Sequence, residues 1–164
     1  MTHVARRRPA HHAVPNRDVD IFADNHLPLI PEGIYDAIGG RAHRPRVIFK
    51  TYKLYIPFDV LVVNPEAADG FDRVRLYRHY RVHPAPDERF RVRATSDYWR
   101  EWVIAAGRRP SRRDRLSPHF FERVLFAVEV HTVTRNGRQH ELSPESTYSV
   151  ISRIIERKAG GASP

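Results

Sequence analysis

An alternating pattern between Val47 and Val63 constrains the fold of this chain more than any other feature of its sequence. In the middle of the stretch one set of side chains is apolar and the intervening set is mostly charged or aromatic: Tyr52, Leu54, Ile56, Phe58 and Val60 against Lys53, Tyr55, Pro57 and Asp59. A period of two places the two sets on opposite faces of a β-sheet. The pattern predicts one long strand, and Pro57 indicates an edge or a bulge because proline donates no ladder hydrogen bond.

A second alternating stretch runs from Arg73 to Val82, after the turn residues Asn64-Pro65 and Asp69-Gly70. One face is again mostly apolar and the other is basic and aromatic: Val74, Leu76, Arg78, Tyr80 and Val82 against Arg75, Tyr77, His79 and Arg81. Shorter strands are expected at residues 33–38, 89–93 and 124–134, the first of them ending before Gly39-Gly40.

One α-helix is predicted between Thr95 or Ser96, either of which can serve as its N-cap, and Gly107. Tyr98, Trp102 and Ala105 recur at helical spacing on one side of it. The aromatic rings could form a stacking surface, but this spacing favours packing in a core.

The C-terminal third contains one turn signal and one ambiguous segment. Asn136-Gly137 predicts a hairpin with a type I′ turn. Residues 148–155 fit either a strand or a helix capped by Ser143-Pro144, and their β-branched side chains favour the strand.

The order of these elements is strand, long strand, strand, helix, strand, strand. It predicts a mainly β protein, an OB-like β-barrel of five strands with one helix between strands 3 and 4. The alternative is an α+β open sheet. The barrel would span residues 29–158, between a flexible basic N-terminal tail at residues 1–28 and a disordered C-terminus at residues 159–164.

The chain is strongly basic. It has 28 Lys and Arg against 19 Asp and Glu, a formal net charge of +9, and an isoelectric point near 10.4. A small basic chain with 41% hydrophobic residues can fold around a core and still present positive charge to an anionic partner. Nucleic acid is the first partner to consider.

Pairing of the two long strands would gather cationic and aromatic side chains on one face: Lys53, Tyr55, Arg75, Tyr77, His79 and Arg81. OB-folds bind oligonucleotides on the corresponding face, with cations on phosphates and rings against bases. A second basic group, which could contact the same strand, follows the helix: Arg108, Arg109, Arg112, Arg113 and Arg115. The alternative for both groups is an ordinary solvated surface.

Several other classes of site find little support. The chain has no cysteine, which excludes disulfides, thiol nucleophiles and cysteine-bound zinc. His79 and His83 would lie about 13 Å apart on a strand, too far to share an ion. Glu156-Arg157-Lys158 resembles a nuclease triplet but lacks a nearby acidic partner. We therefore expect no enzyme activity, metal or cofactor. No apolar run is long enough for a membrane span, so we expect a cytoplasmic protein without membrane contact.

Several strand motifs resemble small uncharacterised proteins encoded on bacterial integrative elements, plasmids and phages: Gly33-Ile34-Tyr35, Lys53–Val63, Arg75–Tyr80, Asp114–Ser117, Thr132–Thr134 and Tyr148–Ile151. The resemblance implies a mobile-element setting and no particular activity. Together with the charge, it predicts a non-catalytic nucleic-acid binding module, preferring single-stranded DNA, that serves replication, recombination or transfer. The alternative function is a protein-interaction or assembly subunit of a larger nucleoprotein complex.

Overall fold

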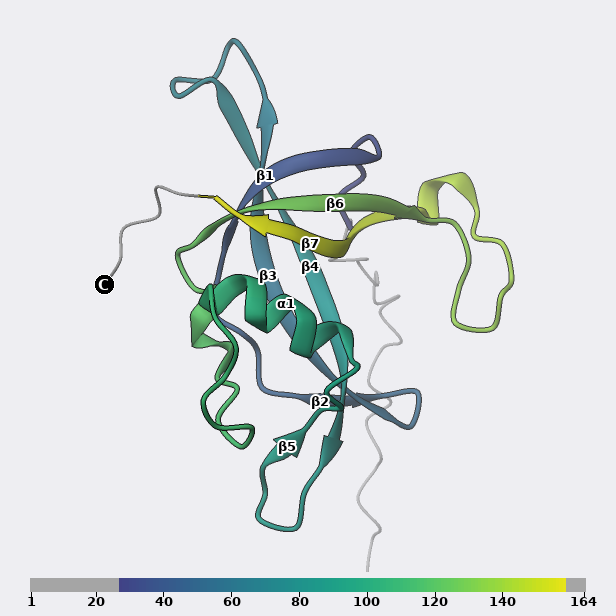
Figure 1. Ribbon diagram of the computed structural model, residues 1–164. Helices are drawn as coiled ribbons and strands as arrows, with labels where there is room; N and C mark the ends of the chain where they lie inside the picture. The colour runs from purple at the N-terminus through teal and green to yellow at the C-terminus, as the bar shows by residue number, and fades with distance from the viewer. Residues whose placement is uncertain (1–26, 159–164) are drawn as a thin grey trace, which may run out of the picture.

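The computed structural model describes residues 27–158, which form one antiparallel sheet of seven strands and one α-helix (Figure 1). The elements in chain order are β1 (Gly33–Gly39), β2 (Arg46–Ile48), β3 (Thr51–Val63), β4 (Phe71–Pro84), β5 (Phe90–Arg91), α1 (Asp97–Ala106), the 3₁₀ turn η1 (Pro118–Phe121), β6 (Leu125–Val133), the 3₁₀ turn η2 (Pro144–Ser146) and β7 (Tyr148–Arg157). The strand order is β5-β4-β3-β1-β6-β7, and β2 pairs with β3.

The sheet is open and strongly bent. In Figure 1, β3 and β4 cross the direction of β1, β6 and β7, and α1 lies over the face that they enclose. β7 approaches both α1 and β4, although no hydrogen-bonded ladder joins β7 to β4. The predicted mainly β class is confirmed. The sheet has seven strands and is open, whereas a barrel of five strands was expected.

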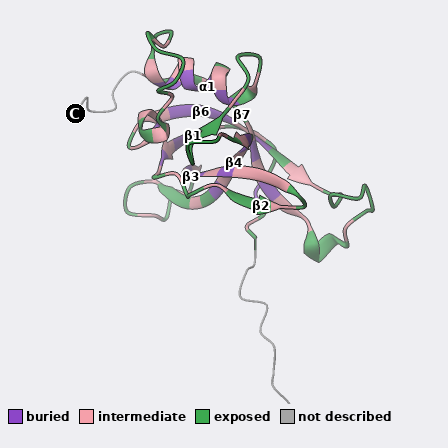
Figure 2. Cartoon of the chain, turned by 90° about the horizontal axis from the view of Figure 1, so that it is seen from below, coloured by how far each residue is buried: buried purple, intermediate pink, exposed green. Residues whose placement is uncertain are grey.

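The core lies between the inner face of the sheet, α1 and η1. Figure 2 shows buried residues concentrated in the middle of the sheet and exposed residues in the loops. The largest fully buried side chains come from four strands and η1: Phe58, Phe121, Phe126, Ile56, Leu76, Ile151, Val60, Val128 and Val130. The alternation predicted for the two long strands is confirmed, since Leu54 to Val60 on β3 and Leu76 to Val82 on β4 bury every second side chain, with Pro57 on β3 as the one exception, buried although it belongs to the other set.

Two details predicted for the first long strand are wrong. The chain reverses at Phe49 and Lys50, whose φ angles of 49° and 61° make a two-residue hairpin between β2 and β3. Neither residue is glycine, so the sequence carries no turn signal there. Pro57 lies in the central strand β3, beyond the point where the β1 ladder ends, and its carbonyl accepts the Gly40 N–H at 2.8 Å. No ladder bond therefore requires a proline N–H.

The helix begins and ends as predicted, and the structure shows which of the two candidate residues is its N-cap. The Ser96 hydroxyl accepts the Trp99 N–H at 3.3 Å, which makes Ser96 the N-cap. Gly107 ends the helix with a φ of 66°, in the left-handed region that glycine adopts without strain. Tyr98, Trp102 and Ala105 are buried, so the predicted core packing is confirmed for these three.

The C-terminal segment is the strand β7, as the β-branched residues favoured. The expected type I′ turn is wrong: neither Asn136 nor Gly137 has a positive φ, whereas Gln139 has a φ of 64°. The reversal itself is confirmed, because Arg135 and Glu141 form an antiparallel bridge and the Gln139 N–H donates to the Asn136 carbonyl at 2.9 Å. This short hairpin lies within the long connection between β6 and β7, which also contains η2. The Asn136 side chain accepts the Arg138 and His140 N–H groups and stabilises this different turn.

The predicted tail and C-terminus fall mostly outside the described residues, at 1–26 and 159–164. Two hydrogen bonds to Ser149 of β7 hold the segment before β1 against the sheet. The Ser149 N–H donates to the Pro28 carbonyl and the Ser149 hydroxyl accepts the Ile30 N–H, both at 2.9 Å. The folded part therefore includes Pro28, one residue before the boundary expected at 28/29.

We expect Gly39→Ala to destabilise the protein by about 1–3 kcal/mol or more, as overpacking does. A Cβ at Gly39 would lie 1.9 Å from the Phe121 carbonyl oxygen, and Gly39 also exchanges backbone hydrogen bonds with Arg123 and Val124. The free energy of unfolding in urea measures the effect. Gly137→Ala is the control, because the nearest atom to its Cβ is 3.9 Å away. Equal stability of the two variants would contradict the close packing of β1 against η1.

Candidate nucleic-acid interface

The predicted strand residues lie together on the outer face of β3 and β4. The two strands pair along their length with Lys53 opposite Arg81, Tyr55 opposite His79, Pro57 opposite Tyr77 and Asp59 opposite Arg75. Side chains directly opposite each other in an antiparallel pair point to the same side of the sheet. All six predicted residues therefore share one surface, which we call the β3–β4 outer face.

The rings on this face are close enough to form one cluster. The ring centroids of Tyr55 lie 6.4 Å from Tyr77 and 5.8 Å from His79. Neither tyrosine is fully exposed or fully buried. Half-exposed rings of this kind retain surface against which a flat ligand can stack.

Two residues on this face, His43 and Arg46, were missed by sequence reasoning. The His43 ring centroid is 5.6 Å from that of Tyr77, and the Arg46 guanidinium lies 5.5 Å from the centre of the Tyr55 ring. They reach the face because the segment before β2 follows β3, with the His43 N–H donating to the Tyr55 carbonyl at 2.9 Å. The only signal in the sequence is a basic run from Arg41 to Arg46.

Positive charge exceeds negative charge on the β3–β4 outer face. Asp59 is bound by Arg75 at 2.9 Å, so these two charges offset each other. Within residues 27–158, Arg46, Lys53 and Arg81 form no ion pair with an acidic side chain. These three cations remain for an anionic ligand.

The pKa values of two rings on this face, His79 and Tyr55, are shifted toward the uncharged form. Burial, together with the positive charges of Lys53 and Arg78, lowers the pKa of His79 below its usual 6.5. Burial raises the pKa of Tyr55 above 10, although Arg46 opposes this. Both shifts favour an uncharged ring that presents a flat surface and a hydrogen-bonding group, while the nearby cations carry the charge.

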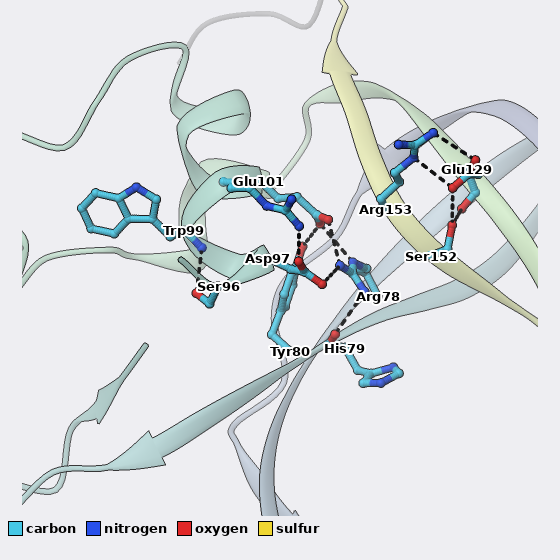
Figure 3. A network of polar contacts seen from close by, with 11 residues as sticks. Arg78, His79, Tyr80, Ser96, Asp97, Trp99, Glu101, Glu129, Ser152 and Arg153 are labelled. Carbon is cyan, nitrogen blue, oxygen red and sulfur yellow. Dashed lines mark hydrogen bonds and ion pairs between the residues drawn. The ribbon is translucent and has the colours of Figure 1, made fainter. Parts of the chain in front are cut away.

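A buried ionic network holds α1 against the inner side of β4, directly behind this face (Figure 3). Arg78 donates to Glu101 at 2.8 and 3.0 Å and to Asp97 at 3.1 Å, and the Tyr80 hydroxyl donates to Glu101 at 2.6 Å. Burial alone would lower the pKa of Arg78, but hydrogen bonding and the charge of Glu101 raise it above its usual value. The network therefore joins α1 to β4 behind the residues on the outer side of that strand.

The arginines after α1 belong to a separate segment, between α1 and η1. All five are exposed, and the structure gives no hydrogen bond or ion pair between them and the β3–β4 outer face: Arg108, Arg109, Arg112, Arg113 and Arg115. Arg112 binds Asp114 at 2.9 Å, which offsets one of the charges. Arg113 and His43 line the same cleft.

Comparisons with protein-family models, curated proteins and solved structures gave no match to this chain. Among the described residues, no helix is both long and apolar enough to cross a bilayer. No group of three or more His, Asp or Glu side chains in that part of the chain is arranged to hold a metal ion.

Proposed function

We propose that this protein is a non-catalytic nucleic-acid binding module that prefers single strands and binds them on the β3–β4 outer face. One observation carries the proposal: Lys53, Arg81 and Arg46, which have no acidic partner among the described residues, lie together beside the half-exposed ring of Tyr55, and the ring of Tyr77 follows next to it on the same face. Cations bind the phosphates of any sequence, and rings stack on any base. A strand would therefore be held with little dependence on its sequence.

The strand path supports this use of the face. Without the short β2 and β5, five strands follow the order β4-β3-β1-β6-β7, with α1 between the third and fourth in the chain. The two ends of that path, β4 and β7, approach each other. We interpret this as an opened OB-like barrel, in which β3 and β4 correspond to the strands that bind oligonucleotides in OB-folds.

The proposed setting comes from the resemblance to proteins of bacterial mobile elements. A module that holds single strands would act in the cytoplasm during replication, recombination or transfer of such an element. Exposed single strands occur in each of these processes.

A second candidate is a protein-interaction subunit of a nucleoprotein complex. It is favoured by the β2–β3 hairpin, where Val47 is 54% and Phe49 84% exposed. β2 also leaves one edge without a strand partner among residues 27–158. An unpaired edge beside exposed apolar side chains is a common docking surface for another chain.

Fluorescence anisotropy of the nuclease-treated protein tests the first function. We expect labelled single strands of about 30 nucleotides, long enough for one or more OB-type sites, to bind more tightly than a duplex of the same length. Three cations on the face predict that the logarithm of the binding constant falls with the logarithm of salt at a slope of about −2 or steeper for single strands. Single-stranded DNA and RNA are compared in parallel.

Equal and weak binding to single strands and duplex would contradict the proposal, because generic charge alone would then explain it. A protein partner that remains bound after nuclease treatment, and is lost in Val47→Ser/Phe49→Ser, would favour the second candidate. That double variant is also the negative control for the strand, since it leaves the β3–β4 outer face intact.

A further inference from the structure

A cleft of about 930 Å³ opens at the end of the sheet where β3 and β4 leave the core uncovered. Its walls are three separate segments, residues 41–45 before β2, residues 85–92 around β5, and residues 113–118 before η1. These segments surround the lower end of β3 and β4 in Figure 1. Leu54, Val82 and Tyr98, which are buried core residues, also line it. The cleft therefore has an apolar interior.

Positive charge surrounds this interior. Five of the lining residues are exposed arginines: Arg41, Arg44, Arg89, Arg91 and Arg113. The two acidic lining residues are each bound to an arginine, Asp87 to Arg89 and Asp114 to Arg112. Four arginines of the cleft thus have no acidic partner in the described part of the chain. An apolar interior with a cationic entrance fits a ligand that has a flat apolar part and an anionic part.

The cleft lies on the inner side of β3 and β4, with Leu54 and Val82, and it meets the β3–β4 outer face at His43, beside the edge of β3. His43 lines the cleft, and its ring contacts that of Tyr77 on the face. Phe90, which also lines the cleft and is 37% exposed, has its ring centroid 5.4 Å from that of Tyr52, a residue on the inner side of β3. A strand on the outer face therefore reaches the cleft by passing His43 at the edge of β3.

We propose that the cleft receives one unstacked nucleotide of the strand that lies on the β3–β4 outer face. Its base enters the apolar interior beside Phe90, and its phosphates bind the arginines at the entrance, with Arg44 and Arg91 on opposite walls. Sites for small ligands measure about 300–1,000 Å³, a range that includes this cleft. This inference rests on the proposed function. An acidic peptide has the same charge, but the rings of His43 and Tyr77 at the junction with the outer face favour the nucleic acid.

Single strands that contain one 2-aminopurine at successive positions test the proposal. With the full chain, we expect the fluorophore at one position to be shielded from acrylamide while the others remain accessible. Arg44→Ala/Arg91→Ala should abolish that shielding and weaken strand binding at least about fivefold, as loss of two phosphate contacts does. Arg135→Ala/Arg138→Ala, which removes two exposed arginines from the β6–β7 connection, is the charge-matched control.

A second pair of variants separates stacking from charge. Phe90→Ala should weaken binding at least about fivefold, the lower limit for losing one stacked base. Phe71→Ala should leave binding unchanged, although Phe71 is 40% exposed and matches Phe90 in type and exposure. Thermal unfolding of all variants shows whether each remains folded.

Three results would overturn the proposal. Strands that bind with every 2-aminopurine equally accessible would leave the proposed function standing and exclude the cleft. Failure of all strands to bind would reject both the proposed function and the role of the cleft. A third result is that a peptide of aspartates and phenylalanines binds the wild type but not Arg44→Ala/Arg91→Ala, while this variant binds strands with unchanged affinity. The cleft would then be a peptide site.

Discussion

Glu101→Ala is expected to lower the free energy of unfolding by about 3–5 kcal/mol, the cost of leaving one member of a buried ion pair without its partner. The side chains of Arg78 and Glu101 are 8% and 4% exposed. Glu101 accepts two hydrogen bonds from Arg78 and one from Tyr80. The alanine variant would leave a buried guanidinium with only the half-exposed Asp97 to offset its charge.

Urea unfolding followed by circular dichroism and tryptophan fluorescence measures this effect. The double variant Arg78→Met/Glu101→Leu should regain much of the lost stability, since apolar side chains of similar size avoid the cost of burying charges. Arg75→Ala is the control. It breaks an ion pair between β3 and β4 that is largely exposed, and such pairs contribute about 0–1 kcal/mol. A Glu101→Ala variant as stable as Arg75→Ala would show that the pair does not hold α1 to the sheet.

Local periodicity predicted the faces of the sheet because it depends only on neighbouring residues. Alternation along Leu54–Val60 and Leu76–Val82 separated the buried side from the outer side, and Ser96 and Gly107 bound the helix as their capping chemistry requires. The residues of the β3–β4 outer face could therefore be predicted from the sequence alone. This prediction needed only the antiparallel pairing of two consecutive long strands.

Features that depend on distant residues were beyond such reasoning. Arg78 stands at a core position of its strand, but its partner Glu101 lies 23 residues away on α1. Arg46 and His43 join the outer face because the chain before β2 follows β3 for several residues, which no local pattern indicates. The cleft combines three segments that are far apart in the sequence. The reversal at Phe49 and Lys50 uses residues that seldom adopt a positive φ, so turn chemistry did not reveal it.

Tyr55→Ala/Tyr77→Ala should weaken single-strand binding strongly, because removing an aromatic ring costs about 1–3 kcal/mol for each stacked base. Tyr77 is expected to account for the larger part. Arg46 already lies over the Tyr55 ring, so less of that ring is free for a base. The single variant Tyr77→Ala should therefore raise the dissociation constant by about 5- to 150-fold in anisotropy titrations.

The cause of that loss can be separated from a loss of folding. Tyr77→Leu keeps an apolar side chain over the sheet but has no π-face, so it should bind as weakly as Tyr77→Ala while its melting temperature stays near that of the wild type. Phe71→Ala removes an exposed ring from the same side of β4 about 20 Å along the strand, at 3.3 Å per residue, and should bind normally. Wild-type affinity in Tyr55→Ala/Tyr77→Ala would exclude stacking on this face, and the arginines and lysine would then act through charge alone.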